Sequence, residues 1–230
     1  MMILVLVFDL DDTLYDELTY VRSGFRAVAE FLRREYGLAV QDSYIDMVER
    51  LQNGRGRIFD DLLIRFGLYS KRNVRSCLSI YRMHKPEIEL FADAAECLQR
   101  FQHLPIYIVT DGNKLVQKNK LIALGLYHRV KLCFITHRYG VKNAKPSPYC
   151  FWKICEREQV SAQEVIYVAD NPRKDFVGIK PLGFHTVRII RGQHKDVELE
   201  AEYEAECRIH SLAELSEDLL ERIKLAQKGG

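Results

Sequence analysis

Carboxylates are concentrated in one short stretch near the start of the chain, residues 7–17, which reads VFDLDDTLYDE. This stretch follows an unbroken apolar run and contains Asp9, Asp11, Asp12, Asp16 and Glu17. Like charges this dense repel one another, and a buried ionised carboxylate is costly unless another charge pairs with it. Carboxylate oxygens are ligands that suit Mg²⁺, so the cluster predicts a bound divalent cation.

Three later stretches place polar side chains at or after the end of an apolar segment. They supply Thr110 and Asp111 in VTDG, Lys145 in NAKPSP, and Asp170 and Asp175 in VADNPRKDF. In an open α/β sheet, ligands bind at the carboxyl ends of the strands, so we expect these groups to surround one pocket with the first aspartates. A lysine and helix N-termini attract an anion. The residues therefore predict a phosphate site beside a Mg²⁺ site.

The elements that must position these side chains can be read from the apolar pattern. Runs without polar alternation, typical of strands buried on both faces of a parallel sheet, occupy residues 3–8, 106–110, 131–136, 164–170 and 185–190. Helical patterns occupy residues 92–103, 113–124, 147–158, 173–181 and 211–223, the last with a capping box from Ser211 to Glu214. This alternation predicts an α/β fold with a doubly wound parallel sheet.

One segment breaks the alternation, because residues 16–88 contain no convincing buried strand. They predict helices near residues 17–36, 41–52, 57–66 and 71–84. We therefore expect a core domain formed by residues 1–15 and 89–230, with residues 16–88 inserted as an all-helical domain.

Taken together, the four stretches resemble the signature of the haloacid dehalogenase superfamily of phosphatases and phosphotransferases. FDLDDT fits the family's D-x-D-x-T pattern, and VTDG, KP and D-x4-D follow in the family's order. The resemblance covers essentially the whole chain and implies a Rossmann-like core. Residues 16–88 lie where the family inserts its helical cap.

The resemblance implies a role for each matched side chain. Asp9 would be the nucleophile that forms an aspartyl-phosphate, and Asp11 would be the acid and base. Thr110 and Lys145 would hold the transferring phosphoryl group, with Lys145 also pairing Asp9. Asp111 would belong to the phosphate-binding group, although the family frequently has Asn at this position.

The same resemblance implies a Mg²⁺ cofactor. Its ligands would be Asp9, the backbone carbonyl of Asp11 and Asp170, with Asp175 binding directly or through water. Haloacid dehalogenases attack carbon and need neither the second aspartate nor the metal, so Asp11 indicates a phosphatase-type member. The sequence departs from the family pattern at Ala169, where Gly is general, and at Ser147, where KPDP is common.

Other residues of the first stretch have structural interpretations. We expect Asp12 to hydrogen-bond the loop, and Thr13 to support it as the family's hydroxyl does. Asp16 and Glu17 are expected to begin the first inserted helix, where the helix dipole favours acids.

The inserted segment is strongly basic, since Asp60 and Asp61 are the only acids between residues 50 and 85. Most of its basic side chains are expected to lie on solvated helix faces. Arg55 and Arg57, however, lie in the glycine-flanked sequence NGRGR. One of them is a candidate to contact a polar or anionic part of the substrate.

The bulk properties set limits on other functions. The 230 residues carry a formal net charge of +2, which argues against a nucleic-acid partner. The six cysteines show no C-x-x-C pair, so reduced core thiols are expected. No run is long enough for a membrane span, and we expect a cytoplasmic monomer or homodimer with no membrane partner.

These features favour a Mg²⁺-dependent phosphomonoester hydrolase of a small phosphorylated metabolite, such as a sugar phosphate or a nucleoside monophosphate. A phosphomutase or other phosphotransferase would use the same aspartyl-phosphate with a different acceptor. A receiver-type signalling module or a catalytically inactive phosphate-binding protein are further alternatives. A receiver would be about half this length and would carry adjacent acids after its first strand, so it is disfavoured.

Overall fold

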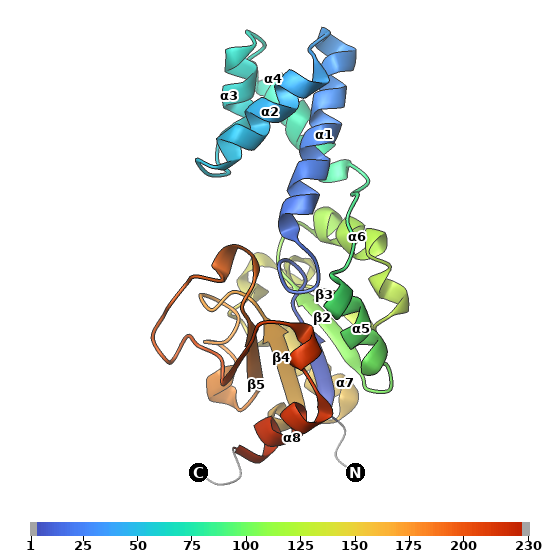
Figure 1. The fold of residues 1–230 in the computed structure, drawn as a ribbon, viewed down its shortest axis with the longest axis vertical. Helices are drawn as coiled ribbons and strands as arrows, with labels where there is room; N and C mark the ends of the chain where they lie inside the picture. The colour runs from blue at the N-terminus through green and yellow to red at the C-terminus, as the bar shows by residue number, and fades with distance from the viewer. Residues whose placement is uncertain (1–3, 227–230) are drawn as a thin grey trace. The chain divides into compact units, whose positions relative to one another are not determined.

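The computed structural model describes residues 4–226, which divide into two units (Figure 1). The described residues up to Glu17 and from Glu89 onward form the sheet-containing unit, and Leu18–Ile88 form the helical unit. The predicted first strand began at Ile3, which lies outside the described residues.

A six-stranded sheet organises the larger unit, with strand order β3-β2-β1-β4-β5-β6 and every neighbouring pair parallel. The strands are β1 (Val5–Phe8), β2 (Ile106–Thr110), β3 (Leu132–Ile135), β4 (Val165–Ala169), β5 (His185–Ile189) and β6 (Cys207–Ile209). The predicted α/β fold with a doubly wound parallel sheet is confirmed. The short edge strand β6 was not predicted.

Four α-helices belong to this unit: α5 (Ala92–Arg100), α6 (Lys114–Ala123), α7 (Tyr149–Glu158) and α8 (Glu217–Ala226). The chain runs outward from β1 to β3 and then returns to β4. Right-handed crossovers consequently place α5 and α6 on one face of the sheet and α7 on the other (Figure 1). Short 3-10 helices occupy Leu126–His128, Thr136–Tyr139, Val141–Asn143, Ala162–Glu164, Lys180–Leu182, Gly192–His194 and Leu212–Glu214.

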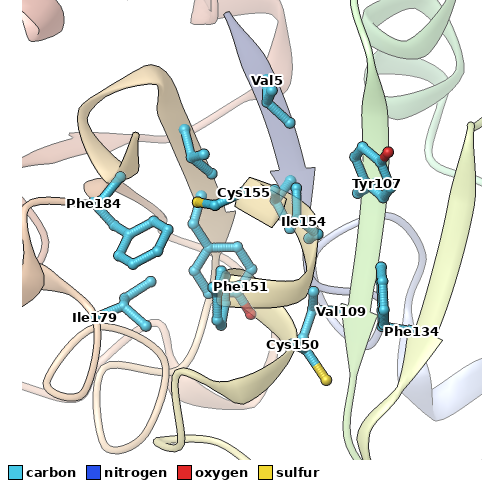
Figure 2. Close-up of a cluster of buried hydrophobic side chains, with 14 of the residues drawn as sticks. Val5, Tyr107, Val109, Phe134, Cys150, Phe151, Ile154, Cys155, Ile179 and Phe184 are labelled. Carbon is cyan, nitrogen blue, oxygen red and sulfur yellow. The ribbon is translucent and has the colours of Figure 1, made fainter. Parts of the chain in front are cut away.

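The core beneath α7 explains why the strands read as apolar runs. Phe151 and Ile154 of α7 pack with alternate residues of the sheet, among them Val5, Tyr107 and Val109 (Figure 2). Each large apolar side chain buried in this way contributes about 1.5–3 kcal/mol relative to an exposed one. This packing fixes the strands whose ends carry the polar residues.

The helix predicted over residues 173–181 is wrong. The segment forms successive turns and the 3-10 helix Lys180–Leu182. Pro172, Gly178 and Pro181 disfavour a regular helix here. A Cβ at Gly178 would lie 1.8 Å from the carbonyl oxygen of Pro146, so the segment follows a path that only glycine permits at this contact.

The single helix predicted over residues 211–223 is also wrong. The capping box of Ser211 and Glu214 is present, but it caps a 3-10 helix. Leu215 is extended, with φ −72° and ψ 91°, and its carbonyl oxygen accepts a hydrogen bond from Arg100 at 2.8 Å. A hydrogen bond from the Leu219 amide to the Ser216 hydroxyl then begins α8.

Four helices form the helical unit, close to the four predicted ones: α1 (Glu17–Tyr36, whose first residue belongs to the larger unit), α2 (Val40–Leu51), α3 (Ile58–Arg65) and α4 (Lys71–Met83). Phe25, Phe59 and Leu62 belong to its own apolar core. The buried Asp46 is paired with Arg50 and Arg65. None of the helices described among residues 4–226 combines the length and the apolar composition that a membrane span requires.

Candidate active site

Three strand ends meet at the point where the strand order reverses. Asp9 directly follows β1, Thr110 ends β2 and Asp170 directly follows β4, and all three residues are buried. Strand β1 pairs with both β2 and β4, so their carboxyl ends lie side by side. Such a switch point is where open α/β sheets bind ligands.

Lys145 enters this point from the loop after β3. Its Nζ donates hydrogen bonds to Asp9 Oδ1 at 2.8 Å and to the Tyr167 hydroxyl at 2.9 Å. The same nitrogen is 2.8 Å from Asp175 Oδ1. The predicted pairing of Lys145 with Asp9 is therefore present, and Tyr167 is an additional partner that the sequence reading missed.

Asp9, Asp170 and Asp175 form a buried cluster in which one carboxylate oxygen from each residue lies within 4.8 Å of the other two. Burial and the neighbouring acids Asp9 and Asp175 raise the pKa of Asp170 to about 9. Burial also raises the pKa of Asp9 to about 6, although Lys145 opposes this shift. A carboxyl cluster this unfavourable in its ionised form fits a hard divalent cation, for which all three side chains offer oxygen ligands.

Thr110 adds an unsatisfied hydroxyl to the pocket. Its Oγ1 is buried and has no hydrogen-bond partner among residues 4–226. Buried polar atoms are normally paired, so an unpaired one at a ligand-binding strand end indicates a missing partner. A phosphoryl oxygen has the chemistry to be that partner.

The Asp11 side chain is not a member of the acidic cluster. The Tyr15 hydroxyl donates to Asp11 Oδ1 at 2.5 Å, as does Lys120 Nζ at 2.6 Å, while Gln117 Nε2 donates to Oδ2 at 2.9 Å. Burial favours a higher pKa, but the Lys120 charge and these hydrogen bonds outweigh it and lower the pKa of Asp11. Gln117 and Lys120 were missed, although a polar pair spaced by three residues just after VTDG was a visible signal.

Asp111 is occupied by contacts of its own. Its Oδ1 accepts hydrogen bonds from the Thr136 hydroxyl at 2.7 Å and from the Lys145 amide at 3.1 Å. Lys174 donates to its Oδ2 at 3.2 Å. The carboxylate therefore links the end of β2 to the loop that carries Lys145.

The remaining residues of the first stretch shape the loop that follows Asp9. Asp12 has a positive φ of 53°, and its carboxylate accepts hydrogen bonds from the amides of Glu17 and Gln193, both at 3.0 Å. A Cβ at Gly192 would approach the Asp12 Cγ to 2.3 Å, so glycine is required there. Thr13 donates to Asp170 at 3.5 Å. The loop role predicted for Asp12 is confirmed.

Arg55 and Arg57 both belong to the helical unit. Arg55 lines a cavity of about 320 Å³ with an apolar wall that includes Phe25 and Phe59. The Nε of Arg57 is 3.6 Å from a carboxylate oxygen of Asp61. Their contact with a substrate stays a prediction.

Comparisons with known proteins show the family of the chain. The model of the haloacid dehalogenase-like hydrolase family matches residues 3–183. A glyceraldehyde 3-phosphate phosphatase from Methanopyrus kandleri is 31% identical over 208 residues, which cover 86% of this chain and 88% of that protein. A protein of the same name from Methanocaldococcus jannaschii is 30% identical over 97% of this chain and 99% of its own length.

Solved structures agree on the fold. A HAD-superfamily hydrolase of subfamily IA from Geobacter sulfurreducens superposes with a TM-score of 0.66 at 18% identity. The superposition covers 95% of this chain and 97% of that one.

Proposed function

The chain belongs to the haloacid dehalogenase-like hydrolases, and we propose that this phosphatase transfers the phosphoryl group of a small metabolite to Asp9 before water releases it. The observation that carries the proposal is the buried Asp9 carboxylate, held by Lys145 at 2.8 Å beside the acids Asp170 and Asp175. In this proposal the Asp9 carboxylate is a nucleophile of fixed orientation, and the neighbouring acids favour the binding of a cation.

In the first half-reaction, Asp9 attacks phosphorus while the bond to the leaving oxygen breaks. Lys145 is placed to orient the Asp9 carboxylate through its hydrogen bond to Oδ1. The Thr110 hydroxyl would hydrogen-bond a phosphoryl oxygen, which gives its buried Oγ1 a partner. Donors fixed in this way are already oriented when charge develops on the phosphoryl oxygens.

Asp11 is proposed as the acid and base. It would protonate the leaving oxygen in the first half-reaction and take a proton from the attacking water in the second. Its contacts with Tyr15, Lys120 and Gln117 keep the side chain out of the acidic cluster, where it would compete for the cation.

Mg²⁺ is proposed to bind Asp9, Asp170 and the backbone carbonyl of Asp11, with Asp175 as a ligand directly or through water. When bound, it would neutralise the clustered carboxylates and the phosphoryl oxygens. The Lys145 contact with Asp175 and the amide of Asn171, which donates to Asp175 at 3.0 Å, already hold that carboxylate in place.

Asp111 is proposed to contribute its backbone amide to phosphate binding. Its carboxylate is engaged by Thr136 and Lys174, and an anionic side chain would repel phosphate. The carboxylate therefore serves to position Lys145, because it accepts a hydrogen bond from the backbone amide of Lys145.

A sugar phosphate is the proposed substrate class, with glyceraldehyde 3-phosphate as the first compound to test. The support is the name shared by two relatives that match at least 86% of this chain. We propose that residues 16–88 act as a cap that selects the substrate, and that Arg55 or Arg57 contacts its polar part. Both arginines would add positive charge near an anionic ligand.

Release of inorganic phosphate from a panel of phosphorylated metabolites tests the proposal. Wild type with Mg²⁺ is expected to release phosphate from at least one triose or hexose phosphate, and Asp9→Asn is expected to release none. Analysis of the products separates the alternatives, because a mutase yields an isomeric phosphate ester instead of free phosphate. No turnover of any ester by the wild type would contradict the proposed function.

A further inference from the structure

Helix α6 presents two buried polar side chains to Asp11. Gln117 and Lys120 lie one helical turn apart and are 4% and 2% exposed. Side chains at this spacing share one face of a helix. A lysine so completely buried is unusual unless its charge is paired.

The partners of Lys120 explain its burial. Its ammonium lies 2.6 Å from Asp11 Oδ1 and 3.9 Å from a carboxylate oxygen of Glu17, and it sits 5.8 Å from the centre of the Tyr15 ring. The ion pair with Asp11 is the shortest of these contacts. Lys120 is therefore directed at the residue proposed as the acid.

Gln117 ties the second oxygen of the same carboxylate to the neighbouring strand end. Its Nε2 donates both to Asp11 Oδ2 at 2.9 Å and to the carbonyl oxygen of Asp111 at 2.6 Å. The Asp11 carboxylate is thus held at both oxygens by one helix face. Its orientation is fixed relative to the end of β2.

The two oxygens of Asp11 are not equivalent. Oδ1 accepts from both Tyr15 and Lys120, whereas within the described part of the chain Oδ2 accepts from Gln117 alone. A carboxylate oxygen offers about two lone-pair sites. Oδ2 is therefore the atom with a position left for a transferable proton.

We propose that Lys120 is a positioning residue for Asp11, which with Gln117 presents Oδ2 to the leaving oxygen of the substrate. The inference rests on the proposed function, in which Asp11 is the acid. As the bond from phosphorus to the leaving oxygen breaks, its electron pair goes to that oxygen, which takes the proton from Oδ2. In the second half-reaction, the oxygen of water bonds to phosphorus while its proton passes to Oδ2. The bond from phosphorus to Asp9 breaks, and its electron pair returns to the Asp9 carboxylate.

A purely structural role for Lys120 would have a different effect on the rates of different substrates. If Lys120 only balanced a buried charge, its loss would slow every substrate by the same factor, through a lower folded fraction. If it positions the acid, its loss would slow substrates in proportion to their need for a proton. An ester with a poor leaving group needs that proton most.

The test compares substituted phenyl phosphates, from p-nitrophenyl phosphate to phenyl phosphate, in the Lys120→Met variant. The ring is common to all of them, so binding changes little while leaving-group basicity changes. The quantity to measure is kcat/KM, because it reports steps up to formation of the phosphoenzyme. Phenyl phosphate is expected to lose at least about tenfold more kcat/KM than p-nitrophenyl phosphate.

Two further variants complete the test. Lys120→Arg keeps the charge and is expected to recover part of the loss for phenyl phosphate. The exposed neighbour Lys118 on the same helix is the matched control, and Lys118→Met is expected to behave as wild type. If Lys120→Met does not fold, Gln117→Leu is measured in its place. It too is expected to lose more kcat/KM for phenyl phosphate than for p-nitrophenyl phosphate.

The outcomes separate this inference from the proposed function. Asp11→Asn should show the complete effect, which is a larger loss of kcat/KM for phenyl phosphate than for p-nitrophenyl phosphate. If Asp11→Asn lacks that selectivity, the role of Asp11 in the proposed function is wrong. If Asp11→Asn shows it while Lys120→Met and Gln117→Leu slow all esters equally or not at all, only the positioning role is overturned.

Discussion

The Lys145 ammonium lies 2.8 Å from Asp9 Oδ1, at the point where β1 ends. The same ammonium contacts Asp175 and Tyr167. The Lys145 ammonium therefore links Asp9, the proposed nucleophile, to Asp175, a proposed metal ligand, and it limits the repulsion between the two carboxylates.

Replacing Lys145 by methionine should abolish most of the activity. The change leaves Asp9 and Asp175 buried without their shared cation and removes a donor near the phosphoryl group. We expect kcat to fall at least about 100-fold, the size of effect seen when one fixed donor is lost. Phosphate release at saturating substrate and Mg²⁺ measures it. The exposed Lys142 gives the control variant Lys142→Met, and equal activity of the two variants would contradict this role.

Tyr167→Phe should weaken the contacts of Lys145 and Asp175, with a smaller effect on activity than the loss of Lys145. It removes an acceptor for Lys145 and the donor of the hydrogen bond to Asp175 at 3.2 Å. The expected cost is about 1 kcal/mol in the free energy of unfolding, with a several-fold fall in kcat. Tyr107 is a matched control, because its buried ring also carries a hydroxyl that bonds an acid, Glu158. Tyr107→Phe should lose similar stability in urea unfolding while keeping kcat.

Asp170→Asn should weaken Mg²⁺ binding, and this effect can be measured both by activity and by thermal stability. The variant removes one charged ligand from the acidic cluster, so the Mg²⁺ concentration for half-maximal activity should rise at least about tenfold. Mg²⁺ should also raise the melting temperature of the wild type, and this shift should shrink in the variant. The exposed Asp196 supplies the control Asp196→Asn. An unchanged thermal shift in Asp170→Asn would exclude this residue as a ligand.

Acid should destabilise the fold partly through Asp93. Burial favours a higher pKa for Asp93, but hydrogen bonds from Arg191, Ser211 and the Leu212 amide outweigh it and lower the pKa below 3.8. A lowered folded-state pKa stabilises the protein above the unfolded value, and this contribution is lost as pH falls through the folded value.

Asp93→Asn should therefore unfold more easily than wild type at pH 7, by about 1–3 kcal/mol. The difference should narrow as the pH is lowered below about 4, the ordinary value for an aspartate. Urea unfolding at several pH values measures both effects. A difference that is constant with pH would contradict the assignment to the Asp93 carboxylate.

The double variant with Arg55→Ala and Arg57→Ala should change substrate recognition only. If either arginine contacts the substrate, KM for the physiological sugar phosphate should rise several-fold, while KM for p-nitrophenyl phosphate should barely change. The exposed Arg72 of the same unit gives the control Arg72→Ala. Equal effects on both esters would overturn this hypothesis.

The sequence identified the residues at the strand ends because their positions depend on a strong local signal. An apolar run such as Val5–Phe8 must be buried, so the polar residue that ends it has a defined place. Thr110 and Asp170 were found by the same argument. The resemblance to a known family supplied the roles but not the supporting contacts.

Residues that act through tertiary contacts could not be found in this way. A glutamine and a lysine on a helix usually indicate a solvent-exposed face, and only the contact with Asp11 distinguishes Gln117 and Lys120. Similarly, the turns of residues 171–183 depend on Gly178 packing against Pro146, which is distant in sequence. Local propensity has no information about either contact.

The most direct test of the account is to trap the phosphoenzyme. Wild type and Asp11→Asn are mixed with Mg²⁺ and p-nitrophenyl phosphate, whose leaving group needs little protonation in the first half-reaction. The samples are then quenched, reduced with borohydride and digested for mass spectrometry. Reduction of an aspartyl-phosphate converts that aspartate to homoserine, and we predict homoserine at position 9, with more of it in Asp11→Asn because the second half-reaction is slowed. Homoserine at another aspartate, or phosphate release by Asp9→Asn at the wild-type rate, would contradict the central claim.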